Sequence, residues 1–141
     1  MVLVDSSVWI EAARRQGDLA TKVALRALLD EYEAAWCSPV KLEVLGGARR
    51  EERRALELFF GVIPYVACGE AEWDAAKALA WRARDGGHAL PWNDVLISAT
   101  AAAREWRVFS RDAHFVTLAG LGGAKLYRPG YGGSYQAEEE S

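Results

Sequence analysis

The chain has 141 residues, a formal net charge of -3 and 51% hydrophobic residues. This length and composition suit one globular domain with a core of its own, and they exclude a disordered or fibrous protein. The small negative charge speaks against a protein that grips nucleic acid by bulk positive charge. A nuclease stays possible, because metal-binding acids lower the net charge while a bound cation restores local positive charge.

No uninterrupted apolar run is long enough to span a bilayer. Met1 leads straight into a short apolar run that ends at Asp5, without the basic segment and cleavage site of an export signal. We therefore expect a cytoplasmic protein that does not bind membranes. In that compartment Cys37 and Cys68 are expected to be reduced thiols that pack as small hydrophobic side chains, with a disulfide as the alternative.

Short apolar runs alternate with longer amphipathic stretches, a pattern that favours an α/β domain with a mainly parallel sheet. The helical stretches carry apolar residues with a helical period, whereas the strand-like runs are short and continuous. In chain order we expect a strand at residues 1–4, helices at 7–14 and 18–33, a strand at 34–37, helices at 38–46 and 49–60, an extended segment at 62–67, helices at 70–84 and 93–105, and strands at 108–109 and 125–127.

Capping residues predict where three of these helices begin. Ser7, Ser38 (followed by Pro39) and Asn93 each precede a helical stretch. We predict one domain over residues 1–128. From Pro129 the chain turns to Gly, Tyr and Ser and then to acids, so residues 129–141 are expected to form a disordered acidic tail.

Four acids fall where a parallel sheet would collect them. Asp5 follows the first strand, and Asp112 follows the strand at 108–109 by a few residues. Glu43 lies about one turn into a helix that follows a strand, and Asp94 lies in the first turn of the helix after Asn93. Because ligands of open parallel sheets bind outside the carboxyl ends of the strands, we expect these side chains to share one edge of the sheet.

Carboxylates gathered in this way repel one another and resist desolvation, so a cation is needed to neutralise them. Oxygen ligands without cysteine or histidine suit Mg²⁺ or Mn²⁺, and such ions support in-line phosphoryl displacement. Each acid alone has a plainer interpretation: Asp5 as a turn residue, Glu43 as a solvated helix residue, Asp94 as an acid favoured by the helix dipole and Asp112 as a helix cap. These plainer interpretations are weaker for the four acids taken together, because Glu43 and Asp94 have apolar neighbours in the sequence, where a lone acid is costly.

Four segments, each with one of these acids, resemble the motifs of PIN-domain ribonucleases. They are residues 2–10, 38–44, 93–101 and 108–115. Their order and spacing are similar to those of the short VapC-type toxins from type II (VapBC) toxin–antitoxin pairs, and the resemblance extends to about residue 128. It implies a PIN-like three-layer α/β domain with a mainly parallel five-stranded sheet flanked by helices.

The resemblance also implies Mg²⁺- or Mn²⁺-dependent endoribonuclease activity on structured RNA, with tRNA the favoured substrate, a cognate VapB-type antitoxin, and a homodimer. All four acids would be catalytic, and Asp5, Asp94 and Asp112 would bind the metal. Ser7 and Ser110 match hydroxyl positions that support the site. His114 departs from the pattern, since some relatives carry a further acid there, and this leaves a second metal position open.

Two kinds of side chain could contact RNA. Arg49 and Arg50 begin a basic cluster suited to phosphate contact, although interleaved glutamates make a solvated salt-bridged face at least as good an interpretation. Tryptophans could stack bases. We expect most of them in the core, including Trp73 and Trp81, which have near-helical spacing. Trp92, next to Asp94 in the sequence, is the tryptophan we expect at the RNA.

The sequence disfavours three alternatives to a metal-dependent nuclease, and two of them are non-catalytic. A receiver-like α/β module would also place acids around Mg²⁺, but Asp5 is followed by two serines and no aspartate ends the strand at 34–37. A degenerate PIN-like scaffold is disfavoured by the presence of all four acids. A nucleotide-binding enzyme is disfavoured because no Gly-rich phosphate loop follows a strand.

Overall fold

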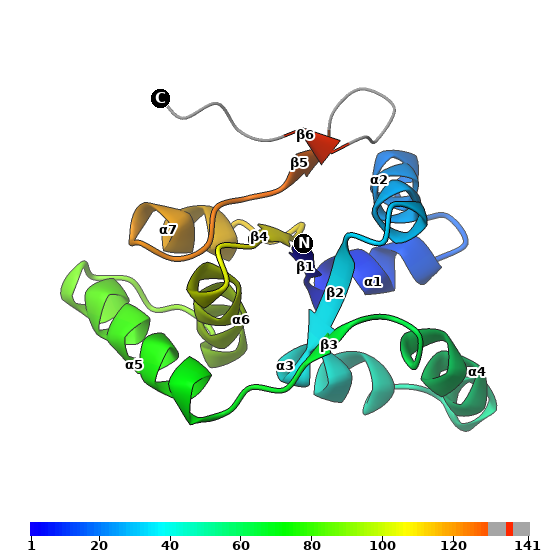
Figure 1. Ribbon diagram of the computed structural model, residues 1–141, viewed down its shortest axis with the longest axis horizontal. Helices are drawn as coiled ribbons and strands as arrows, with labels where there is room; N and C mark the ends of the chain where they lie inside the picture. Colours follow the sequence, from blue (N-terminus) through cyan, green and yellow to red (C-terminus); the bar gives the residue numbers. More distant parts are fainter. Residues whose placement is uncertain (130–134, 137–141) are drawn as a thin grey trace.

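The computed structural model describes residues 1–129 and 135–136, and a parallel sheet runs through its centre (Figure 1). The sheet has the order β3-β2-β1-β4. Its strands are β3 (Tyr65–Val66), β2 (Ala34–Cys37), β1 (Val2–Val4) and β4 (Arg107–Phe109), and all three pairings are parallel. Val108 of β4 also forms a parallel bridge with Leu126. This bridge supplies a fifth position at the β4 edge, so the predicted mainly parallel sheet is confirmed.

Helices cover both faces of the sheet, which gives the predicted three-layer α/β domain. Figure 1 shows one group to the left of the sheet: α5 (Glu70–Asp85), α6 (Trp92–Ala103) and α7 (His114–Gly120). To the right lie α1 (Ser6–Ala13), α2 (Leu19–Asp30) and α4 (Arg50–Phe60). The short α3 (Ser38–Val40) and the π-helix η1 (Lys41–Leu45) follow β2 directly. A separate antiparallel pair joins β5 (Arg128–Pro129) to β6 (Tyr135–Gln136).

Strand β1 lies in the middle of the hydrophobic core. Its three residues are all buried, as expected for a parallel strand with helices on both faces. Trp9 and Trp36 are also buried, and each indole N–H finds a carbonyl: Trp9 Nε1 donates to Val4 (3.0 Å) and Trp36 Nε1 donates to Ile63 (3.1 Å). These bonds satisfy the only polar atom of each side chain, which lets the rings pack as core residues.

The prediction that Trp73 and Trp81 belong to the core is wrong. Helix α5 packs on α6 through a stripe of small and aliphatic residues, Ala76, Leu79 and Ala83, which recur at helical spacing. The two tryptophans fall outside this stripe and are 54% and 60% exposed. A face of small residues lets two helices approach closely, so the bulky indoles remain on the surface of α5.

The prediction that Ser7 caps α1 is also wrong, because the cap is Asp5, whose carboxylate accepts a hydrogen bond from Ser7 N. The Ser7 hydroxyl is used elsewhere: it donates to Asp5 and accepts from the Arg111 amide. Asp5 therefore caps α1, and the Ser7 hydroxyl connects this cap with the loop after β4.

Helix α6 similarly begins at Trp92, with Pro91 rather than Asn93 at the cap position. Asn93 lies inside the first turn, and its amide nitrogen donates to Glu43 Oε1 over 3.3 Å. Helix α3 begins at Ser38 itself, after Cys37. The Ser38 hydroxyl accepts from the Cys68 amide over 2.9 Å and so connects α3 with the segment after β3.

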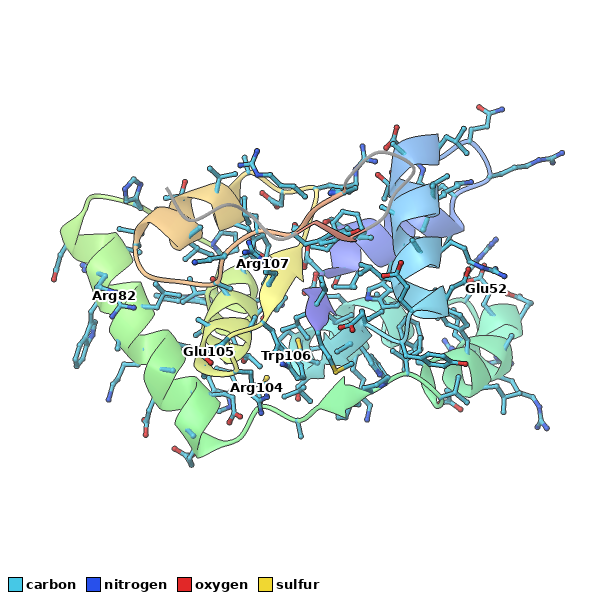
Figure 2. All side chains as sticks on the ribbon, turned by 45° about the horizontal axis from the view of Figure 1, so that its top comes forward. Glu52, Arg82, Arg104, Glu105, Trp106 and Arg107 are labelled. Carbon is cyan, nitrogen blue, oxygen red and sulfur yellow. The ribbon has the colours of Figure 1, made fainter. Side chains whose placement is uncertain are left out.

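The turn from α6 to β4 marks the amino end of the sheet. Figure 2 labels Arg104, Glu105, Trp106 and Arg107 there, and Arg104 Nη2 lies 2.8 Å from Glu72 Oε1 of α5. In a parallel sheet this end is opposite the one from which the chain leaves β1 and β4. The ion pair therefore supports the fold at a distance from the predicted acids.

Cys37 is buried and Cys68 is half-buried, and both are free thiols, as predicted. Within the described residues, no helix combines the length and hydrophobicity needed to cross a membrane. Of the predicted acidic tail, residues 130–134 and 137–141 lie outside the described residues.

Candidate metal centre

Asp5 stands at the carboxyl end of the central strand. Its amide donates to the Phe109 carbonyl of β4 over 2.9 Å, so the chain is still paired to the sheet at this point. The residue is only 4% exposed. A carboxylate buried to this extent requires polar partners.

Ser7 and Ser110 supply these partners. Ser7 Oγ donates to Asp5 Oδ2 over 2.7 Å, and Ser110 Oγ donates to the same oxygen over 2.8 Å. Ser110 Oγ also accepts from the Asp112 amide over 3.0 Å. The two hydroxyls thus connect the end of β1 with the loop after β4, and none of these bonds uses Asp5 Oδ1.

Glu43 and Asp94 approach from two helical segments. Glu43 lies in η1, and π-helical turns are rare and frequently occur at functional sites. Asp94 lies in the first turn of α6, where the helix dipole favours an acid. The Asn93 side chain joins the two segments through its bond to Glu43.

Asp94 and Asp112 meet at His114, the first residue of α7. His114 Nδ1 lies 2.9 Å from Asp94 Oδ2 and 2.9 Å from Asp112 Oδ1. One ligand atom from each of the three residues lies within 4.8 Å of the other two. Three candidate ligands therefore converge on one point beside the end of β4.

Electrostatic effects connect Glu43 and Asp94 with the neighbouring acids. Partial burial raises the pKa of Asp94, and the carboxylates of Asp5 and Asp112 raise it further. Partial burial also raises the pKa of Glu43, again with contributions from Asp5 and Asp94. The ionised forms of these two acids are therefore disfavoured by burial and by like charge, and a bound cation would offset both effects.

The donor set fits a divalent cation. Carboxylate oxygens are hard ligands of the kind that Mg²⁺ and Mn²⁺ take, and His114 adds one nitrogen. Beside this set, Ser6 Oγ is buried without a hydrogen bond of ordinary length among the described residues, although this hydroxyl lies near enough to the Glu43 carboxylate to lower its pKa. A water molecule or ligand at the site could satisfy this hydroxyl.

Sequence reasoning missed the contacts of His114 and Asn93. For His114 a signal was present, since Asp112 and His114 are two residues apart at the start of a helix and can bind one ion from the same turn. For Asn93 the capping interpretation hid the long-range partner. The long-range contacts, from His114 to Asp94 and from Asn93 to Glu43, do not follow from the local sequence alone.

The three predicted RNA contacts lie at the surface. Trp92 is 76% exposed and precedes Asp94 by two residues. Arg49 pairs with Glu52 at 2.8 Å, in agreement with a solvated salt-bridged face. Arg50 is exposed at the first residue of α4. Among the contacts of the described residues, neither arginine reaches the four acids.

Comparison with known proteins gives matches over most of the chain. Residues 2–121 match the family model of the PIN domain. Ribonuclease VapC11 of Mycobacterium tuberculosis is 35% identical over 124 residues, which cover 84% of this chain and 92% of the relative.

Solved structures share the fold at lower sequence identity. FitAcB from Neisseria gonorrhoeae superposes with a TM-score of 0.75 at 20% identity, over 92% of this chain and 98% of the other. A toxin-antitoxin complex from Klebsiella pneumoniae has a TM-score of 0.67 at 19% identity, over 80% of this chain and 88% of the other.

Proposed function

This chain belongs to the PIN-domain family and is a VapC-type ribonuclease toxin, and from that premise we propose that it cuts structured RNA with Mg²⁺ or Mn²⁺ held in a four-carboxylate site. The observation that carries the proposal is the grouping of Asp5, Glu43, Asp94 and Asp112, in which partial burial and the Asp5 carboxylate raise the pKa of both Glu43 and Asp94. A structural role alone would not require four carboxylates at one sheet edge.

In this proposal the acids divide into two roles. Asp5, Asp94 and Asp112 hold the cation, and Ser7 and Ser110 orient Asp5 through their hydrogen bonds. The bound ion would activate water and offset charge on the phosphoryl oxygens. Glu43 accepts the proton of the attacking water, because its raised pKa brings it closer to that of an effective general base at neutral pH.

The substrate we propose is an unpaired loop of a structured RNA, with tRNA favoured by the family. Bases in single-stranded loops are accessible, whereas the deep groove of an A-form helix hides them. Trp92 supports this choice, because its exposed indole, two residues before Asp94 in the chain, can stack such a base. We propose Arg49 and Arg50 as weak contacts to the RNA phosphates.

The partner we propose is a VapB-type antitoxin, which would act with this protein in the cytoplasm. A groove of about 980 Å³ runs between α1, α2 and α4, and Glu43 is among its lining residues. Apolar side chains such as Leu29 and Phe59 line it together with both acids and bases, a mixture that suits a protein segment. A segment in this groove would end next to the metal centre.

We also propose that the chain forms a homodimer. Trp73 and Trp81 leave large apolar side chains exposed on α5. They line a second groove of about 870 Å³ between α5 and α6, and exposed apolar patches of this kind often mark protein interfaces.

One experiment tests the enzymatic proposal. Calorimetry should show divalent binding that Asp5→Asn and Asp94→Asn weaken strongly, and total RNA should be cut by the wild type with Mn²⁺ but not by these variants. Asp85→Asn, on the exposed end of α5, is the control and should behave like the wild type. Binding and cutting that are unaffected by both site variants would contradict the site, and a wild type that binds RNA without cutting it would favour the non-catalytic alternative.

A further inference from the structure

His114 stands among the carboxylates in a position that an ion ligand would take. We propose that His114 Nδ1 binds the same divalent ion as Asp94 and Asp112, and that this nitrogen makes the site prefer Mn²⁺ to Mg²⁺. The inference rests on the proposed function and adds to it one ligand and a metal preference. The family resemblance implied a set of acids only, whereas this chain has an imidazole in the set.

The distances around His114 suit one coordination sphere. Nδ1 lies 2.9 Å from an oxygen of each aspartate. In an octahedral site with ligands about 2.1 Å from the ion, neighbouring ligand atoms are about 3.0 Å apart. The nitrogen and either oxygen already have the spacing of adjacent ligand positions, and the two aspartate atoms, which lie within 4.8 Å of each other, complete the set when they approach the same ion.

The surrounding backbone holds these ligands together. The His114 amide donates to Asp112 Oδ1 over 3.0 Å, which orients that carboxylate at the start of α7. The next residue, Phe115, is buried and anchors the helix in the core. The imidazole itself is 41% exposed, so it can be replaced without disturbing the core.

The chemistry of the two ions gives the preference. Mg²⁺ takes oxygen ligands and keeps several waters, whereas an imidazole nitrogen is a good ligand for transition-metal ions. In the metal-free protein Nδ1 is hydrogen-bonded to Asp94. To bind the ion, the ring releases any proton on Nδ1 to solvent, presents that lone pair and carries its remaining proton on Nε2. A nitrogen in place of a further carboxylate oxygen therefore weakens the binding of Mg²⁺ more than that of Mn²⁺.

Electron spin resonance of bound Mn²⁺ tests the ligand directly, because a nitrogen ligand adds a hyperfine coupling to the spectrum. The chain has two histidines, so the assignment needs only two variants. We expect nitrogen coupling in the wild type and in His88→Gln, which alters an exposed residue in the loop between α5 and α6. We expect the coupling to be lost in His114→Asp. Mn²⁺ that binds to the wild type without nitrogen coupling would overturn the inference and leave the proposed function standing.

Calorimetry with the two ions tests the preference. His114→Ala should weaken Mn²⁺ binding about tenfold or more, on the scale of supporting groups around other metal sites, and should weaken Mg²⁺ binding less. His114→Asp should bring the two affinities closer together, while His88→Gln should keep the wild-type ratio. Equal losses for both ions in His114→Ala would overturn the preference. No binding of either ion to the wild type would overturn the proposed metal site itself.

Discussion

Ser110 Oγ donates a hydrogen bond of 2.8 Å to Asp5 Oδ2, although the two residues are 105 positions apart in the chain. The bond joins the ends of two neighbouring parallel strands. Asp112 is tied to the same hydroxyl through its amide. One serine thus fixes the relative positions of two proposed metal ligands.

Ser110→Ala should therefore weaken metal binding while leaving the fold intact. Asp5 keeps its bond from Ser7 but loses its second hydroxyl partner, so its carboxylate becomes less well oriented. Loss of such a supporting group costs about 10- to 100-fold in metal affinity. Calorimetric titration with Mn²⁺ measures the change, and Thr117→Ala on α7 is a control outside the site. Full affinity in Ser110→Ala would show that Ser7 alone orients Asp5.

Asp94→Asn should not destabilise the metal-free protein at alkaline pH. Burial raises the pKa of Asp94, so its ionised form is less favourable in the folded state than in the unfolded chain. Removing this charge offsets the possible loss of about 0.5–1 kcal/mol of helix-dipole stabilisation. Thermal melts at about pH 9 should place the variant no lower than the wild type. A drop of several kcal/mol would identify Asp94 as a structural acid.

The contact between Asp94 and His114 predicts how the difference in stability between the wild type and Asp94→Asn changes with pH. The contact with Asp94 raises the pKa of His114, and Asp94 has a raised pKa of its own. Raised folded-state values give stability that is present at low pH and lost as the pH rises through them. The melting temperature of the wild type should therefore rise relative to that of Asp94→Asn as the pH falls from about 9 to about 5. A difference between the two melting temperatures that does not vary with pH would contradict this coupling.

Periodicity and the position of the acids predicted much of the fold. The runs at Val2–Val4 and Ala34–Cys37 are short and fully apolar, and both are central parallel strands. Helix faces were harder to predict, because α5 buries alanines and leaves two tryptophans exposed. Which face of a helix is buried depends on how it packs against its partner, and α5 packs on α6 through Ala76, Leu79 and Ala83.

Local patterns also failed at the capping residues, for a reason that concerns the site. Ser7 and Asn93 are both residue types that favour helix caps. The Ser7 hydroxyl instead bonds Asp5 and the Arg111 amide, and the Asn93 side chain bonds Glu43 of η1. Capping preferences consider only neighbours in the sequence. Long-range contacts outweighed them at the two helices that carry the site, where departures from local rules are expected.

An antitoxin that inhibits by covering the acids should compete with Mn²⁺. A guanidinium or ammonium group from such a partner would pair with the carboxylates and take the place of the metal. The groove that Glu43 helps to line gives the partner a surface beside one of these acids. Binding of a VapB-type antitoxin should weaken as Mn²⁺ increases, and it should change in Asp5→Asn. Affinity that responds to neither would show that inhibition works elsewhere on the surface.

RNA recognition should depend on local contacts rather than on overall charge. A chain with a net charge of -3 attracts RNA little at long range, so binding must rest on the metal centre and a few exposed side chains. Trp92 is the exposed aromatic residue next to Asp94 in the chain. We expect Trp92→Ala to lose about 1–3 kcal/mol of RNA affinity, the usual value of one base–aromatic stack, and to keep wild-type metal binding.

Tyr32→Ala is the control, because it removes an aromatic ring that is 87% exposed after the end of α2 and that lines neither groove. Its RNA affinity should stay close to that of the wild type if stacking at Trp92 is specific. Mapping of the new RNA ends after digestion should show one or a few cuts in the loop of a structured RNA. Uniform degradation of every unstructured RNA, or equal losses in both variants, would contradict recognition of a loop by Trp92.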